Sequence, residues 1–246
     1  MISIARTIKE TFYFFYNHFT PILSNLWLVI TINLLFTYAF HIQYDILFSI
    51  TDNRWIGDSI EAFGVLIFSP FYVHPLFNMI VKGRLERRNF LGIAWSMNDA
   101  RYLFWNLLFL FPTLLSILLS HGATEAALAF ERLLPEDPSY GTVALGICFL
   151  ILLSTIVLCG VAFFVTRFLP KFFSFYDTKP LSFKESWGLT KKKTFKIFLA
   201  NNAVYIGLLF VSHHIEVTSL ATFLEVFATL IQATASCFIY KKLKEI

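Results

Sequence analysis

The chain has 246 residues, of which 57% are hydrophobic and only 15% are charged, and its net charge is +4 at pH 7. A typical soluble domain is about 45–50% apolar and about 25% charged. So few charged side chains do not cover a water-facing surface, which excludes a soluble globule, a disordered chain and a coiled coil. The mean hydropathy of +0.66 instead places the chain in a lipid bilayer.

Apolar runs long enough to cross a bilayer occur six times. A hydrocarbon core about 30 Å thick needs roughly 20 helical residues, and the runs lack the alternation of barrel strands. We therefore predict an all-α membrane protein, with a single integral membrane domain over residues 1–246 and six transmembrane helices. The second helix is expected to be broken or bent at Pro70 and Pro75, which bracket His74. The predicted spans cover residues 20–42, 60–81, 102–120, 141–169, 197–213 and 217–240.

Amphipathic segments before the odd-numbered spans predict helices that lie in the membrane plane, over about residues 3–19, 89–101 and 182–196. In the third segment, Ser182 and Glu185 have the spacing of a capping box, which starts a helix. Aromatic residues on one face and lysines on the other are typical of a helix in the head-group region. An in-plane helix followed by a transmembrane hairpin recurs over about residues 1–59, 84–139 and 180–246. This pattern indicates three helical-hairpin repeats, or simply helices that anchor each hairpin.

Basic residues are distributed very unequally between the two sides of these spans. Eighteen of the 20 lysines and arginines fall on one side, and only Arg54 and Arg132 fall on the other. The positive-inside rule then places both termini in the cytoplasm. The net charge is a consequence of this asymmetry, so no nucleic-acid partner is expected.

The basic side is predicted to contact the anionic lipid head groups of the bilayer, which attract each nearby cation by about 1 kcal/mol. A partner protein in the membrane is a further expectation, with its identity open. The candidate lipid contacts are Arg84, Arg87, Arg88, Lys191, Lys192 and Lys193.

Ionisable and amide side chains inside a membrane often mark function. Glu225 lies about 12 Å below the outer boundary of the sixth span, at 1.5 Å per residue, and it shares a stripe of small and polar side chains with Gln232. This stripe is expected to face other helices, and the opposite apolar face of the same helix is expected to face lipid. Glu225 is either a proton or cation site or a protonated carboxyl that donates a hydrogen bond. The candidate intramembrane polar site is Glu225, Gln232, Asn33 and His74, although His74 has the alternative of bonding a carbonyl that the prolines free.

Signatures of catalysis are missing from the sequence. It contains no HExxH, GxSxG, GxxxxGK or GxGxxG motif. The three cysteines have neither zinc-site nor redox spacing. We therefore expect a non-enzymatic protein without catalytic, metal-binding or cofactor-binding residues.

Two segments carry a family resemblance. TFYFFYNHFTPIL, residues 11–23, and LSFKESWGLT, residues 181–190, resemble the YciC-type family of uncharacterised bacterial inner-membrane proteins. The resemblance implies a six-span inner-membrane protein with a role in envelope maintenance, which we expect to act through lipid or protein contacts. The alternative is a small transporter or channel-like protein with a polar path near Glu225, and a lipid-modifying enzyme is a third hypothesis.

Overall fold

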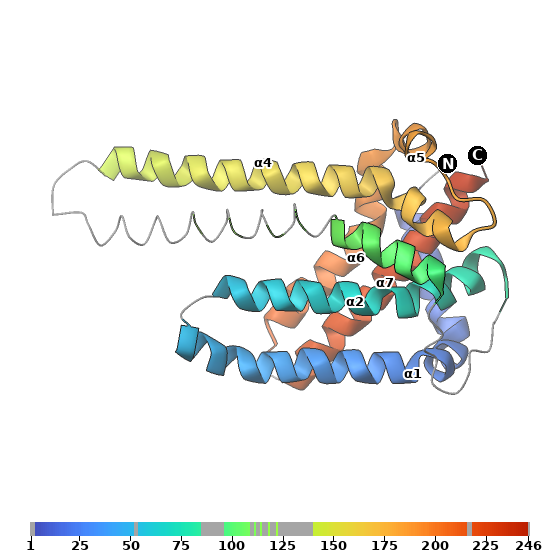
Figure 1. Ribbon diagram of the computed structural model, residues 1–246, viewed down its shortest axis with the longest axis horizontal. Coiled ribbons are helices and arrows are strands. Elements are labelled where there is room, and N and C mark those ends of the chain that lie inside the picture. Colours follow the sequence, from blue (N-terminus) through green and yellow to red (C-terminus); the bar gives the residue numbers. More distant parts are fainter. Residues whose placement is uncertain are drawn as a thin grey trace.

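The computed structural model describes residues 3–51, 54–84, 96–108, 140–215 and 218–245, and four single positions between 109 and 139. For residues 40–66 and 140–147, and at a few single positions, only the backbone is described. All regular structure in these residues is helical (Figure 1). The helices are α1 (Ile4–Thr51), α2 (Arg54–Val81), α4 (Tyr140–Phe173), α5 (Phe183–Thr190), α6 (Thr194–His213) and α7 (Thr218–Lys244), with a 3-10 turn at Ser174–Tyr176 and a further helical stretch over 97–108.

Four of the described helices are long and apolar enough to cross a membrane. Their apolar segments are Ile4–Ala39, Ile151–Tyr176, Thr194–Ser212 and Ser219–Lys244, which correspond to the first, fourth, fifth and sixth predicted spans. The second and third predicted spans, over 60–81 and 102–120, include positions or side chains outside the described part. The number of six spans and the three repeats therefore stay predictions.

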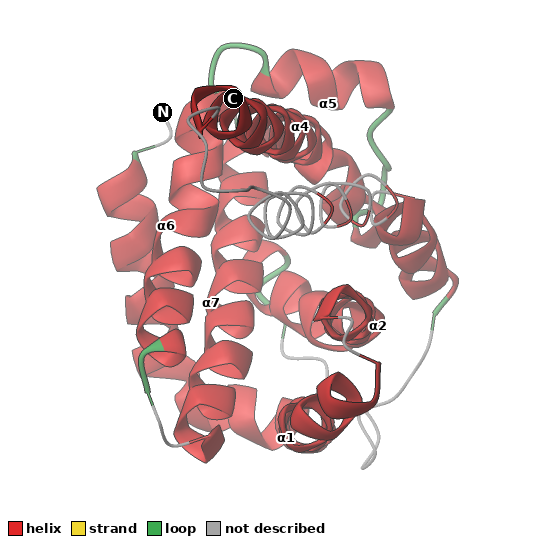
Figure 2. Ribbon diagram, turned by 90° about the vertical axis from the view of Figure 1, so that its left-hand side faces the viewer, coloured by secondary structure: helices red, strands yellow, loops and turns green. Residues whose placement is uncertain are grey.

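The helices are arranged in two directions. α1 after its kink, α2 and α4 run along the long axis of the molecule, with α1 beside α2, whereas α6 and α7 cross them obliquely (Figures 1 and 2). α7 is the central helix, because it packs against α1, α2, α4 and α6. Its predicted inward stripe is buried at Ala221, Ala228 and Ala235.

The opposite face of α7 corrects one expectation. Leu220 and Phe223 are exposed, as a lipid-facing surface requires, but Leu230 and Ile231 are buried. The reason is that α1 packs on this side of α7, where Phe15 contacts Phe227 and Phe14 contacts Phe238. The apolar face of α7 is therefore open near its beginning and covered further along.

α1 contains the sharpest change of direction in the described helices. His18 leaves helical geometry, with φ −119° and ψ 18°, and Pro21 follows within the helix. Proline removes a backbone donor and weakens the preceding turn, which accounts for the kink. The section before the kink corresponds to the predicted in-plane helix over 3–19, and it packs on α7 through the ring contacts of Phe14 with Phe238 and of Phe15 with Phe227. α2, in contrast, continues through Pro70 and Pro75 as one helix, so it is not broken there, and the alternative of a bend stays a prediction.

α5 starts at the capping box that the sequence predicted at Ser182 and Glu185. The Ser182 hydroxyl accepts from the Glu185 amide at 3.2 Å, and the Ser182 amide donates to the Glu185 carboxylate at 2.6 Å. The helix ends at Thr190, and α6 begins at Thr194, so the predicted helix over 182–196 is too long. The Thr190 hydroxyl is turned inward to the Arg167 carbonyl, which fixes the end of α5 against α4. Most of the predicted helix over 89–101 lies outside the described residues.

Candidate functional site

Gln232, one of the predicted polar residues, pairs with a neighbouring helix. Its Nε2 donates to Oδ1 of Asn202 on α6 at 2.8 Å. One turn further along α7, the Ser236 hydroxyl donates to Oδ1 of Asn201 at 2.5 Å. Both bonds join neutral side chains inside apolar helices, which is how polar residues hold membrane helices together. These contacts assign Gln232 a structural role between α6 and α7.

His74 lies elsewhere and has an ionised partner. Its Nδ1 donates to Oδ1 of Asp99 at 3.0 Å, and the ring of Tyr176 stacks on the imidazole at 4.6 Å. The other carboxylate oxygen of Asp99 accepts from the amide of Ser96 at 2.7 Å and from its hydroxyl at 2.5 Å. Burial raises the pKa of Asp99, but the hydrogen bonds from His74 and Ser96 outweigh burial, so the pKa lies below its ordinary value. Asp99 is therefore a buried carboxylate that joins α2 to the helix over 97–108.

Asp99 was missed by the sequence analysis, although a signal for it exists. Ser96 and Asp99 have the same three-residue spacing as Ser182 and Glu185, and they form the same reciprocal bonds. A serine followed three residues later by an acidic residue is the sign of a helix start. Applied at Ser96, this rule identifies Asp99 as a fixed carboxylate before the third predicted span.

Asn33 and Glu225 complete the predicted polar site. Asn33 is buried in α1, and its Oδ1 has no hydrogen-bond partner. Glu225 is half-buried on α7, and its backbone carbonyl accepts from the Thr229 hydroxyl at 3.0 Å. Gln232 and His74 have separate partners, on α6 and at the start of the helix over 97–108. These contacts place Gln232 and His74 in different parts of the molecule.

Four of the six predicted lipid contacts lie within the described residues. Lys191 and Lys192 are exposed in the turn between α5 and α6, and Lys193 is half-buried. Arg84 is exposed beyond the end of α2, where Gly83 takes a left-handed φ of 63° and the Arg84 amide donates to the Asn78 carbonyl at 3.1 Å. Arg87 and Arg88 fall outside the described residues.

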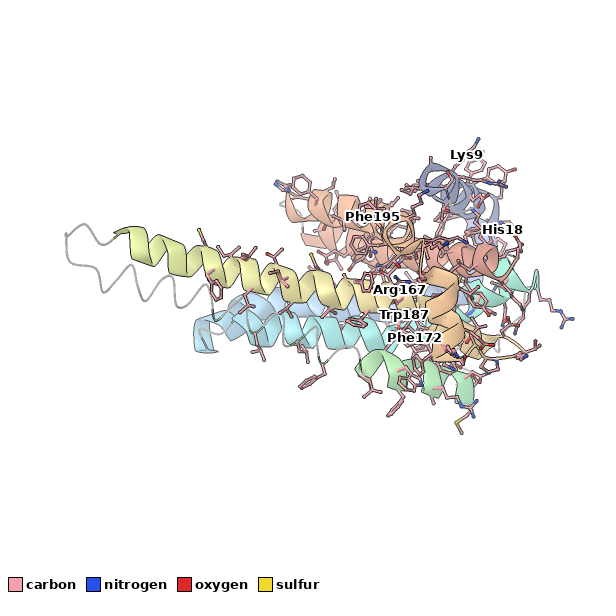
Figure 3. The ribbon with its side chains drawn as sticks, turned by 90° about the horizontal axis from the view of Figure 1, so that it is seen from above. Lys9, His18, Arg167, Phe172, Trp187 and Phe195 are labelled. Atoms are coloured by element: carbon pink, nitrogen blue, oxygen red, sulfur yellow. The ribbon has the colours of Figure 1, made fainter. Side chains whose placement is uncertain are left out.

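A buried arginine holds the lysine turn in place. The guanidinium of Arg167 lies 4.9 Å from the ring centre of Phe163 and 4.7 Å from that of Trp187. Figure 3 shows Arg167 and Trp187 where α5 crosses α4. Its Nη2 donates to the Lys191 carbonyl at 3.0 Å, whereas Nε and Nη1 have no partner. In return, the Ser186 hydroxyl donates to the Arg167 carbonyl at 2.9 Å. The sequence analysis counted Arg167 only as a charge.

The three lysines at the end of α7 each contact a different segment. Lys241 donates to the carbonyl of Ile80 at 3.1 Å, and Lys242 pairs with Glu10 and donates to the Thr7 hydroxyl at 3.2 Å. Lys244 pairs with Asp177, whose carboxylate also accepts from the Tyr240 hydroxyl at 2.8 Å. Burial raises the pKa of Asp177, but the bonds from Lys244 and Tyr240 outweigh it and leave the pKa lowered.

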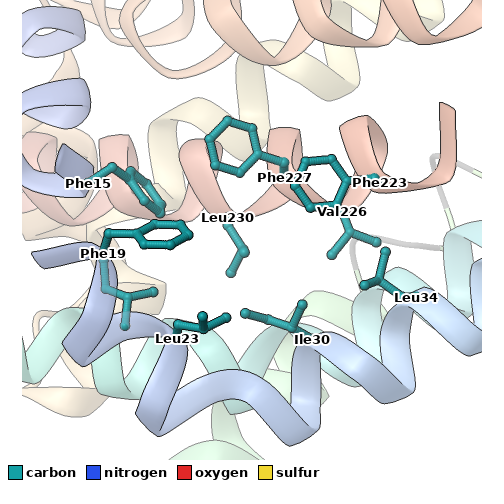
Figure 4. Close-up of a pocket in the computed structure, with 10 residues that line it drawn as sticks. Phe15, Phe19, Leu23, Ile30, Leu34, Phe223, Val226, Phe227 and Leu230 are labelled. Carbon is teal, nitrogen blue, oxygen red and sulfur yellow. The ribbon is translucent and has the colours of Figure 1, made fainter. Parts of the chain in front are cut away.

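A groove lies between α1 and α7 (Figure 4). Its first part is a cavity of about 80 Å³ with only apolar side chains around it. Its second part, of about 410 Å³, is larger, and the residues around it include Thr31, Tyr38, Ser219 and Thr222. The Thr222 side chain is 2% exposed, and its hydroxyl has no hydrogen-bond partner. A buried hydroxyl without a hydrogen bond lowers the stability of the folded protein by about 1–3 kcal/mol.

The described residues contain no group of three or more histidine, cysteine, aspartate or glutamate side chains arranged to hold a metal ion. Comparisons of the chain with protein-family models, curated proteins and solved structures find no match. The resemblance to the YciC-type family therefore stays a prediction from its two segments.

Proposed function

We propose that the chain is a six-span protein of the bacterial inner membrane, with both termini in the cytoplasm. Its proposed role is non-enzymatic and lies in envelope maintenance, through contacts between its basic end and anionic lipid head groups. The observation that carries this proposal is the turn of Lys191, Lys192 and Lys193, of which the first two are exposed, and which the buried Arg167 of α4 holds through the Lys191 carbonyl.

The surroundings of the turn suit a membrane surface. Phe195 is 72% exposed directly after the three lysines, and it projects from the start of α6 (Figure 3). Trp187 is half-buried on α5, just before the turn. Cations beside exposed aromatic rings match the boundary between head groups and acyl chains, where the rings enter the apolar layer and the cations meet phosphates.

The lysine turn is a better lipid contact than the end of α7. Lys242 and Lys244 already neutralise the carboxylates of Glu10 and Asp177. The turn has no such acidic partner among the described contacts, so its positive charge is available to lipid phosphates. The proposal therefore assigns lipid selectivity to the turn and a structural role to the lysines of α7.

Lipid selectivity in reconstituted vesicles tests this proposal. Spin-labelled phosphatidylglycerol and phosphatidylcholine report which lipid is enriched around the protein. Replacing Lys191, Lys192 and Lys193 together by glutamine is expected to lower the preference for phosphatidylglycerol by about fivefold per cation at low salt. The matched control replaces the same residues by arginine and retains the preference. Equal selectivity of the glutamine variant and the unmodified protein contradicts the proposal.

A transporter with a polar path near Glu225 is the second candidate. The unpartnered Oδ1 of Asn33 favours it, because a transported polar group is one way to satisfy a buried oxygen. Solute or proton flux in proteoliposomes tests this function, with Glu225→Gln as the variant. Flux that Glu225→Gln abolishes, while the fold is retained, favours transport over the lipid-contact function.

A further inference from the structure

We draw no further inference here: the strongest candidate, the apolar groove between α1 and α7 that Leu34 and Phe223 line along both of its parts, carries nothing because no observation in the structure shows what covers it.

Discussion

The basic end of the molecule and the contact between α6 and α7 use different kinds of polar pair. At the basic end the pairs are ionic, as between Asp177 and Lys244 or between Glu10 and Lys242. Between α6 and α7 they are neutral, as between Gln232 and Asn202. Transfer of a charged side chain from water into the protein interior costs several kcal/mol, even after the protein has relaxed around it. Transfer of a neutral amide costs less, and a hydrogen bond to another side chain offsets most of that cost. The type of pair thus follows the local access to water.

Removing a buried carboxylate at the basic end has the largest expected effect. Asp99→Ala deletes the acceptor for His74 and for Ser96, and breaking a buried charged pair costs about 3–5 kcal/mol. We expect a large fall in the melting temperature of the purified protein in detergent. Asp99→Asn keeps one acceptor oxygen, so its melting temperature is expected to lie between those of Asp99→Ala and the unmodified protein. A melting temperature that stays the same in Asp99→Ala contradicts the assigned network.

Low pH is expected to destabilise the charged pairs of Asp99 and Asp177 and to leave the hydrogen bond between Gln232 and Asn202 unchanged. The pKa values of Asp99 and Asp177 are lowered in the folded protein. Each carboxylate therefore contributes stability that is fully present above its unfolded pKa of about 4 and is lost as the pH falls through the lower folded value. Thermal melts from pH 6 to about pH 2 should show this loss. The double variant Asp99→Asn, Asp177→Asn should have a flatter profile, and an equally steep profile contradicts the assignment.

The neutral contact between α6 and α7 is expected to contribute less. Asn202→Leu and Gln232→Leu each remove one partner of the amide pair, and hydrogen bonds between membrane helices average about 0.6 kcal/mol with a maximum near 1.7 kcal/mol. A double-mutant cycle, with unfolding followed by circular dichroism, isolates the pair. The coupling is expected to be insensitive to pH and salt, and a coupling that falls with salt contradicts a neutral bond.

The smallest effect is expected at Lys244, which is more than half exposed. Lys244→Gln removes its ion pair with Asp177, and exposed pairs contribute about 0–1 kcal/mol. Added salt should weaken the contribution further. The same melting assay at low and high salt measures this, with Lys184→Gln as a control at an exposed lysine of α5. A loss as large as that of Asp99→Ala would show that depth does not decide the strength of these pairs.

Local signals in the sequence predicted local structure well. The start of α5 follows from Ser182 and Glu185, and the end predicted for the fifth span, residue 213, is the last residue of α6. The apolar periodicity also identified the buried alanines of α7. Each of these features depends on residues within one or two helical turns, which a single sequence contains.

Features that depend on contacts between distant segments were not predicted. Periodicity divides α7 into two faces but does not say which helices cover them, so the burial of Leu230 and Ile231 was missed. Arg167 was counted as a charge because the rings around it come partly from another helix. Pro70 and Pro75 predicted that α2 is broken or bent, but the residue that leaves helical geometry is His18 in α1. Which proline-containing helix kinks depends on packing against other segments.

The lysines at the end of α7 have a consequence for biogenesis. The bond between Lys242 and Thr7 joins residues 235 positions apart in the chain. α7 follows every other described helix, so a ribosome synthesises it after them. Until α7 has been synthesised, the carboxylates of Glu10 and Asp177 lack their lysine partners, and α1 lacks one of the helices that it packs against. The contacts of the basic end with α7 therefore form only after the last of the described helices has been synthesised.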